Sequence, residues 1–149
     1  MPRITLTVNK SHLELVGQVY SPKLTGGATV KFMIDTGSSV TILSLRDAEM
    51  MGIDGETLPR SPQKSVGYGG PMELRILENV MLVFAADDVK AKAIELRTVA
   101  VQYSPLKDKR VARMLYSVPT VLGTDALTAG EMTLWADWKL AQAHLDYID

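Results

Sequence analysis

The chain has 149 residues, which is enough for one ordinary folded domain with a hydrophobic core, and we expect residues 1–149 to form a single domain. Its 16 Lys and Arg residues nearly balance its 17 Asp and Glu residues, and the net charge of -1 therefore predicts no binding to nucleic acid. The absence of cysteine excludes disulfides, thiolate metal sites and a cysteine nucleophile.

The first third of the chain is expected to form strands. Residues 4–8 alternate between apolar and polar side chains, which predicts a strand rather than a signal peptide. A second strand is expected over 13–20, in a hairpin with the first, and a polar loop over 21–27 leads to a strand over 29–34.

The middle of the chain predicts one short helix between strands. A short strand over 40–43 precedes a helix over 44–51, with Ser44 as its N-cap, Asp47 completing a capping box and Gly52 ending the helix. Two long strands, over 72–86 and 89–101, are joined by a turn at Asp87 and Asp88, whose carboxylates we expect to be solvated rather than to bind a metal. Residues 103–116 predict a loop with at most a short helical turn.

The C-terminal segment predicts two further strands around a turn near Asp137. Trp135 and Trp138 could line a pocket, but packing in the core or at a subunit contact is favoured, because tryptophan has a large apolar area. The longest strongly apolar run, about residues 80–86, is far shorter than the roughly 20 residues of a membrane-spanning helix. We therefore expect a cytoplasmic protein that does not bind membranes.

Three short motifs carry the chemistry. In the first, Asp35 ends an apolar strand and is followed by Thr36, Gly37, Ser38 and Ser39, so the carboxylate should be half buried and surrounded by hydrogen-bond donors. The second motif is Val121-Leu122-Gly123, followed by Thr124 and Asp125. The third lies between them in the sequence and is glycine-rich: Gly67, Tyr68, Gly69 and Gly70.

In their order along the chain, the three motifs resemble those of the single-lobed, retroviral-type (retropepsin-like) aspartic proteases, over about residues 28 to 145. The resemblance implies an all-β fold: a single-lobed, retropepsin-like acid protease barrel with a flap hairpin and one or two short helices. It also implies that Gly123 lies behind the Asp35 loop, where any Cβ would collide with neighbouring backbone.

The resemblance further implies a role for each motif residue. The catalytic loop would consist of Asp35, Thr36 and Gly37. Substrate would contact Ser38 and Ser39, and also the flap residues Gly67, Tyr68, Gly69 and Gly70. Structural support would come from Leu122, Gly123 and Asp125. Asp125 is the strongest rival carboxylate and could pair with Asp35 within one subunit, but its place at the start of a helix favours a capping or loop-supporting role.

The chain contains one Asp-Thr-Gly, whereas hydrolysis by this mechanism needs two carboxylates that share a proton. The standard example of such a pair is the aspartic protease class itself. A homodimer would supply the second carboxylate, because residues near a two-fold axis meet their own copies. We therefore predict an aspartic endopeptidase that cleaves an extended polypeptide and needs no metal or organic cofactor. Pepstatin should bind to the carboxylate pair, provided that its side chains fit the cleft. The alternative is a peptide-binding or dimerisation module of the same fold with little or no turnover.

Overall fold

The computed structural model describes residues 1–62, 73–88, 90–104, 113–114 and 116–148. The predicted flap residues and most of the predicted 103–116 loop lie outside these ranges. The strands are β1 (Arg3–Asn9), β2 (His12–Tyr20), β3 (Ala28–Ile34), β4 (Ile42–Leu43), β5 (Glu73–Ala85), β6 (Ala91–Tyr103), β7 (Thr120–Leu122), β8 (Met132–Asp137) and β9 (Gln142–Tyr147). The helices are α1 (Leu45–Met50), the 3-10 helix η1 (Gly55–Thr57) and α3 (Thr124–Ala129).

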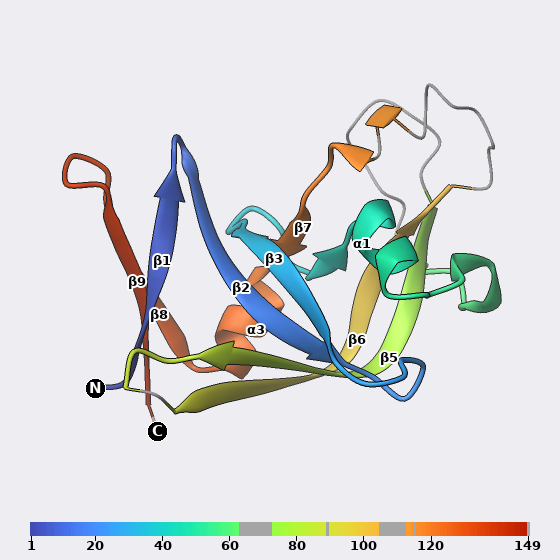
Figure 1. Cartoon of the computed structure of the whole chain (residues 1–149), viewed down its shortest axis with the longest axis horizontal. Coiled ribbons are helices and arrows are strands. Elements are labelled where there is room, and N and C mark those ends of the chain that lie inside the picture. The colour runs from blue at the N-terminus through green and yellow to red at the C-terminus, as the bar shows by residue number, and fades with distance from the viewer. Residues whose placement is uncertain (63–72, 89, 105–112, 115, 149) are drawn as a thin grey trace.

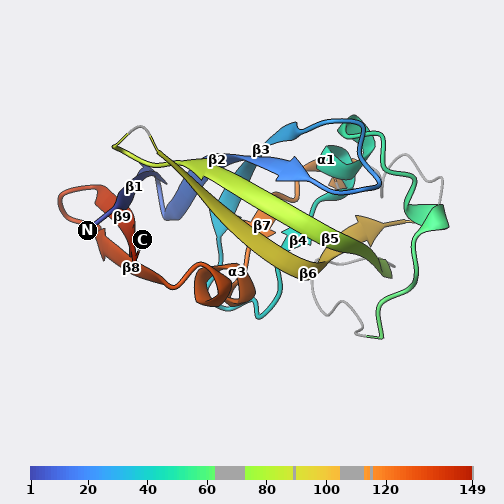
Figure 2. The ribbon, with the colours of Figure 1, turned by 90° about the horizontal axis from the view of Figure 1, so that it is seen from below.

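Six of the strands close into a barrel. Their order is β3-β7-β4-β6-β5-β2, and β2 pairs with β3 to complete the ring (Figure 1). β5 and β6 are the longest strands and run antiparallel, side by side, along the barrel (Figure 2). The prediction of an all-β barrel with few short helices is confirmed.

The remaining strands, β1, β9 and β8, extend the sheet beyond β2, and we call them the arm (Figure 1). β1 pairs with β2 on one side and with β9 on the other. β8 pairs with β9 and ends the sheet order, so its outer edge is open among the described strands. No helix in the described part of the chain is long and apolar enough to cross a membrane.

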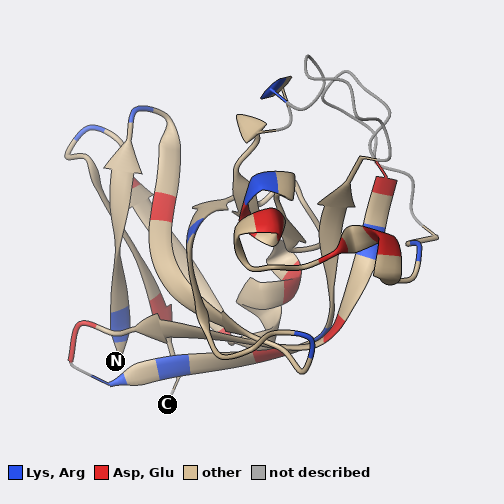
Figure 3. Cartoon of the chain, turned by 45° about the vertical axis from the view of Figure 1, so that its right-hand side comes forward, with Lys and Arg blue, Asp and Glu red and all other residues tan. Residues whose placement is uncertain are grey.

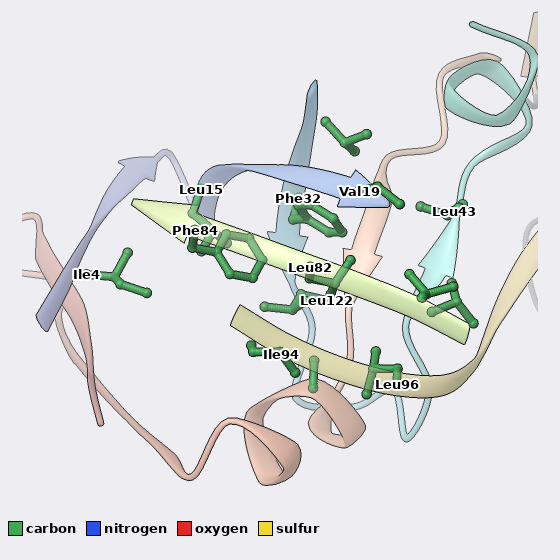
Figure 4. Packing of buried hydrophobic residues seen from close by; sticks show 14 of the residues in the cluster. Ile4, Leu15, Val19, Phe32, Leu43, Leu82, Phe84, Ile94, Leu96 and Leu122 are labelled. Atoms are coloured by element: carbon green, nitrogen blue, oxygen red, sulfur yellow. The ribbon is translucent and has the colours of Figure 1, made fainter. Parts of the chain in front are cut away.

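The barrel core is built from alternate residues of the strands. Phe32 and Phe84 are fully buried and meet edge to face, with ring centroids 5.5 Å apart (Figure 4). A Cβ at Gly17 of β2 would overlap the Phe84 ring, which explains a glycine in the middle of this strand. Leu82 and Leu122 complete the same fully buried layer. The period-two pattern that predicted these strands is therefore the pattern of the core.

Helix α1 begins as predicted, but the predicted capping box does not form. The Ser44 hydroxyl accepts a hydrogen bond from the Asp47 backbone N–H at 3.1 Å. The reciprocal bond is absent, because the hydroxyl of Thr120 in β7 donates to the Asp47 carboxylate at 2.6 Å and accepts from the Ser44 N–H at 2.9 Å. A buried residue from a distant strand thus replaces half of the local motif.

Two other expectations also change. Asp87 is not simply solvated, because its carboxylate accepts hydrogen bonds from the backbone N–H and the hydroxyl of Thr5 in β1, at 3.0 and 2.6 Å. Trp135 and Trp138 do not belong to the core, since 43% and 55% of their surfaces are exposed, and their packing at a subunit contact stays a prediction. Basic and acidic residues are interspersed along the ribbon in Figure 3 rather than gathered on one side of that view.

Candidate active site

The position of Asp35 follows from the pairing of two parallel strands. β3 and β7 lie side by side with Ile34 opposite Leu122. The ladder continues one residue further, since the Asp35 N–H donates to the Leu122 carbonyl at 3.1 Å. The chain then turns, and the Ser38 N–H donates to the Asp35 carbonyl at 3.1 Å. Asp35 therefore stands at the carboxyl end of β3, at the start of residues 35–41, which we call the Asp35 loop.

Asp35 is half buried, as expected, and the two oxygens of its carboxylate differ. Oδ1 accepts a hydrogen bond from the Gly37 N–H at 2.9 Å. Oδ2 has no hydrogen-bond partner among the described residues. Only one of the expected donors is used, because the Ser38 hydroxyl donates to the Val40 carbonyl at 2.7 Å and the Thr36 side chain is exposed. One oxygen is thus held in place while the other can bind a water or a second carboxyl group.

Gly123 supports the loop from behind. A Cβ at this position would lie 2.5 Å from both the carbonyl carbon and the carbonyl oxygen of Val40, and 2.9 Å from the Ser38 carbonyl oxygen. The next residue, Thr124, donates its N–H to the same Ser38 oxygen at 2.9 Å. The two backbones touch directly, so there is no room for any side chain at position 123.

Asp125 holds the far end of the loop. Its carboxylate accepts from the Thr41 N–H at 3.0 Å, from the Thr41 hydroxyl at 2.8 Å and from the Ala126 N–H at 2.7 Å. Thr41 is fully buried, and its hydroxyl also accepts from the Gly123 N–H at 3.1 Å. Helix α3 is capped by Gly123 without a side-chain bond, so Asp125 is not its N-cap. The carboxylate of Asp125 is committed to the loop and makes no hydrogen bond with Asp35.

Two pockets flank the Asp35 loop. The first, the arm pocket, has a volume of about 390 Å³ and is lined by Asp35, Thr36, Leu13, Leu134, Ala136 and Trp138, among others. The second, the β6 pocket, has a volume of about 380 Å³ and is lined by Val40, Ser61, Pro62, Ile76, Ala100 and Asp125, among others. The loop thus separates a pocket under the arm from one beside the barrel.

Sequence reasoning missed several of these residues. Thr41 is an ordinary residue in the sequence, and only its distant partner shows that it braces the loop. Leu134 and Ala136 alternate on β8, which could have indicated a shared face. Ser39 is exposed, whereas Gly67, Tyr68, Gly69 and Gly70 lie outside the described residues. Within the described ranges, no three His, Asp or Glu side chains are grouped as metal ligands.

Comparison with known proteins gives a family match and a fold. A family model described as aspartyl protease matches residues 22–126, a span that contains both the Asp35 loop and Gly123. No curated protein matches the chain. A retropepsin-like aspartic protease from Rickettsia conorii superposes with a TM-score of 0.63 at 18% identity, over 97% of this chain and 90% of that one. The retroviral protease-like domain of Ddi1 from Leishmania major superposes with a TM-score of 0.48 at 16% identity, over 91% of this chain and 94% of that one. The first of these likenesses shows a shared fold.

Proposed function

Because the chain belongs to the aspartyl protease family, we propose that it is a homodimeric endopeptidase in which the Asp35 carboxylates of two protomers act together. The observation that carries this proposal is the state of Asp35 at the end of β3. Asp35 is half buried, one carboxylate oxygen is fixed by Gly37, and the other has no partner in the described part of the chain. At Asp125, by contrast, both carboxylate oxygens accept hydrogen bonds from neighbouring residues.

The reaction proposed for this pair is hydrolysis without a covalent intermediate. The ionised carboxylate takes a proton from a water molecule, whose oxygen attacks the peptide carbonyl, while the protonated carboxyl donates its proton to the carbonyl oxygen. The tetrahedral intermediate collapses as the carboxyl that took the water proton passes it to the peptide nitrogen. The C–N bond then breaks, the amine departs, and the other carboxylate takes back a proton from a hydroxyl of the intermediate. Thr36 and Gly37 would keep the two loops in place, and no metal or organic cofactor takes part.

The arm supports the proposal of a dimer. Trp138 and Leu140 expose 55% and 61% of their surfaces in the turn between β8 and β9, and apolar groups gathered in this way favour an interface. Trp138 also lines the arm pocket together with Asp35, so a second copy seated there would reach the carboxylate. The open edge of β8 could pair with a strand of that copy. One surface would then bury the apolar side chains and complete the carboxylate pair.

The proposed substrate is an extended polypeptide. An extended chain can bind along a groove through its backbone, with side chains in separate pockets. Ser38 and Ser39 follow the carboxylate along the same loop, and the β6 pocket opens beside Val40. The roles of Gly67, Tyr68, Gly69 and Gly70 as a flap remain proposals from the sequence.

Hydrolysis of casein over a range of pH, with and without pepstatin, tests the proposed activity. The Asp35→Asn variant should keep the thermal midpoint of the wild type and lose cleavage, because Asn matches the shape of Asp but cannot hold or release the proton. Asp88→Asn, a change in an exposed turn, is the matched control and should cleave normally. Tight binding of peptides by the wild type without cleavage at any pH would instead favour the peptide-binding module.

The composite site has its own test. Wild type and Asp35→Asn are mixed in equal amounts and allowed to exchange subunits. A quarter of the dimers would then contain two intact chains, so the mixture should keep about half of the activity of its wild-type chains. Full activity in a mixture shown by sedimentation to contain heterodimers would contradict a shared site.

A further inference from the structure

Arg75 in β5 is unusual because it is a buried charge. Only 7% of its surface is exposed, and it is the one charged residue in the buried class within the described ranges. Arginine is seldom buried unless its guanidinium is paired. Its contacts therefore indicate what it holds in place.

The guanidinium joins three parts of the chain. Nη1 donates to the carbonyl oxygens of Leu58 and Glu56, at 2.8 and 3.3 Å. Nε and Nη2 donate to Glu73 Oε2 at 3.2 and 3.0 Å. The guanidinium carbon lies 4.5 Å from the centroid of the Tyr103 ring, a cation–π contact. Arg75 thus fixes the backbone around η1 against the ends of β5 and β6.

The segment held by Arg75 continues into a wall of the β6 pocket. Directly after Leu58, the Pro59 carbonyl accepts from the Ile76 N–H at 2.9 Å, and the Ser61 N–H donates to the Leu74 carbonyl at 2.8 Å. Residues 59–62, which we call the strip, therefore lie along β5. The last two residues of the strip line the β6 pocket together with Val40 of the Asp35 loop.

We propose that Arg75 is a positioning residue for peptide binding, which fixes the strip as a wall of the pocket beside the Asp35 loop. This inference rests on the proposed function, because it concerns the groove that would bind the substrate. A buried ion pair adds little stability over an apolar replacement of similar size. The planar fork of arginine does, however, fix the directions of the groups that it bonds. Loss of Arg75 should therefore change the position of the strip more than the stability of the barrel.

The first experiment measures the strip directly and needs no turnover. Hydrogen exchange at the Ser61 and Ile76 amides should speed up at least about tenfold in Arg75→Met, with no comparable change at core amides of β2 and β3. Arg75→Lys keeps the charge without the fork and should be intermediate. Arg46→Met, at an arginine of α1 whose side chain is 50% exposed, is the matched control and should exchange like the wild type. Unchanged exchange at both amides in Arg75→Met would overturn the proposal.

The second experiment measures peptide affinity. Labelled peptides that together span the casein sequence are titrated into Asp35→Asn protein, and the peptide that binds most tightly, which this variant should not cut, serves as the probe. Adding Arg75→Met should weaken the affinity about fivefold or more, whereas adding Arg46→Met should not. In the active protein, Arg75→Met should raise KM by a similar factor and change kcat by less than about twofold. Loosened exchange with unchanged affinity would make Arg75 merely structural and overturn its role in binding.

Two further variants test the proposal if Arg75→Met fails to fold. Tyr103→Leu removes the aromatic face and Glu73→Gln removes the charge of the partner, while both leave Arg75 and its carbonyl contacts in place. Each should show the same changes in exchange and affinity to a smaller degree. Absence of peptide cleavage by the wild type would disprove the proposed catalysis, but the exchange and binding measurements would still decide the role of Arg75.

Discussion

Gly123→Ala tests how tightly the Asp35 loop is held by the backbone behind it. The added Cβ would lie 2.5 Å from the carbonyl carbon and oxygen of Val40, and 2.9 Å from the carbonyl oxygen of Ser38. Atoms of a flexible side chain could move aside, but these are backbone atoms that carry hydrogen bonds from Thr124 and from the Ser38 hydroxyl. The loop or β7 must therefore shift by several tenths of an ångström or more.

The size of the effect follows from this geometry. An extra carbon in a packed site costs roughly 1–3 kcal/mol, and contact with backbone on two sides places this substitution at the upper end. For a chain of this length, 1 kcal/mol lowers the thermal midpoint by about 2–4 °C, so a loss of about 3 kcal/mol predicts a decrease of roughly 6–12 °C. A displacement of about 1 Å in a catalytic group can also reduce a rate by about a hundredfold. Activity should thus fall by more than the loss of folded protein explains.

The matched control is Gly130→Ala. Its added Cβ would meet the side chains of Ile94 and Met132, each at 3.1 Å, and these can adjust by rotation. We expect a cost below about 1 kcal/mol and an unchanged rate of casein cleavage. Thermal unfolding of both variants, and hydrolysis measured well below both midpoints, would compare them directly. Equal midpoints and equal rates for the two variants would refute a supporting role of Gly123 behind the loop.

Three further predictions concern the support, the arm and acid stability. Asp125→Asn replaces an acceptor of the Thr41 hydrogen bonds by a donor, so the free energy of unfolding in denaturant should fall by about 1–3 kcal/mol while cleavage stays measurable. Complete loss of cleavage in folded protein would return Asp125 to the catalytic candidates. Trp138→Ser should raise the dimer dissociation constant in sedimentation, and an unchanged constant would remove the arm from the interface. The hydrogen bond and charge of Arg3 lower the pKa of Asp146, so this carboxylate stabilises the fold above the unfolded pKa of about 4 and the contribution is lost as pH falls through the lowered value. The thermal midpoint of Asp146→Asn should therefore lie below that of the wild type at pH 7 and approach it in strong acid, and a difference that persists there would contradict the assignment.

The sequence predicted those parts of the fold that depend on neighbouring residues. Alternation of side chains located the β1–β2 hairpin and β3, and the glycine-rich loop between β2 and β3 marked where the chain turns. The Ser44 cap and the end of α1 near Gly52, where φ is +77°, are also local signals. All of them act within a few residues, so one sequence is sufficient to recognise them.

The sequence could not predict which polar groups meet across the fold. Asp87 binds Thr5, 82 positions away. The hydroxyl of Thr120, 73 positions away, donates a hydrogen bond to the Asp47 carboxylate, which replaces the bond expected in the capping box. We expected solvent around Asp87 and a nearby partner for Asp47, and in each case the carboxylate is bonded by a residue distant in the sequence. The exposure of Trp135 has a related cause, because Trp135 alternates with Leu134 and Ala136 on β8 and the sequence alone does not reveal which face of the strand packs on the protein.

The candidate site depends on both kinds of information at once. The motif around Asp35 is local and predicts a carboxylate at the end of a strand, but the loop keeps its shape through β7 and α3, with Asp125 bonded to Thr41 across 84 positions. The support is rigid at Gly123, where backbone touches backbone, and polar at Asp125, where three donors meet one carboxylate. Because neither contact involves the free oxygen of Asp35, damage at residues 120–125 should act through the position of that oxygen and leave its chemistry unchanged. Such variants should lower kcat while the shape of the pH profile stays that of the wild type, whereas a shifted profile would mean that the support also tunes the protonation of the pair.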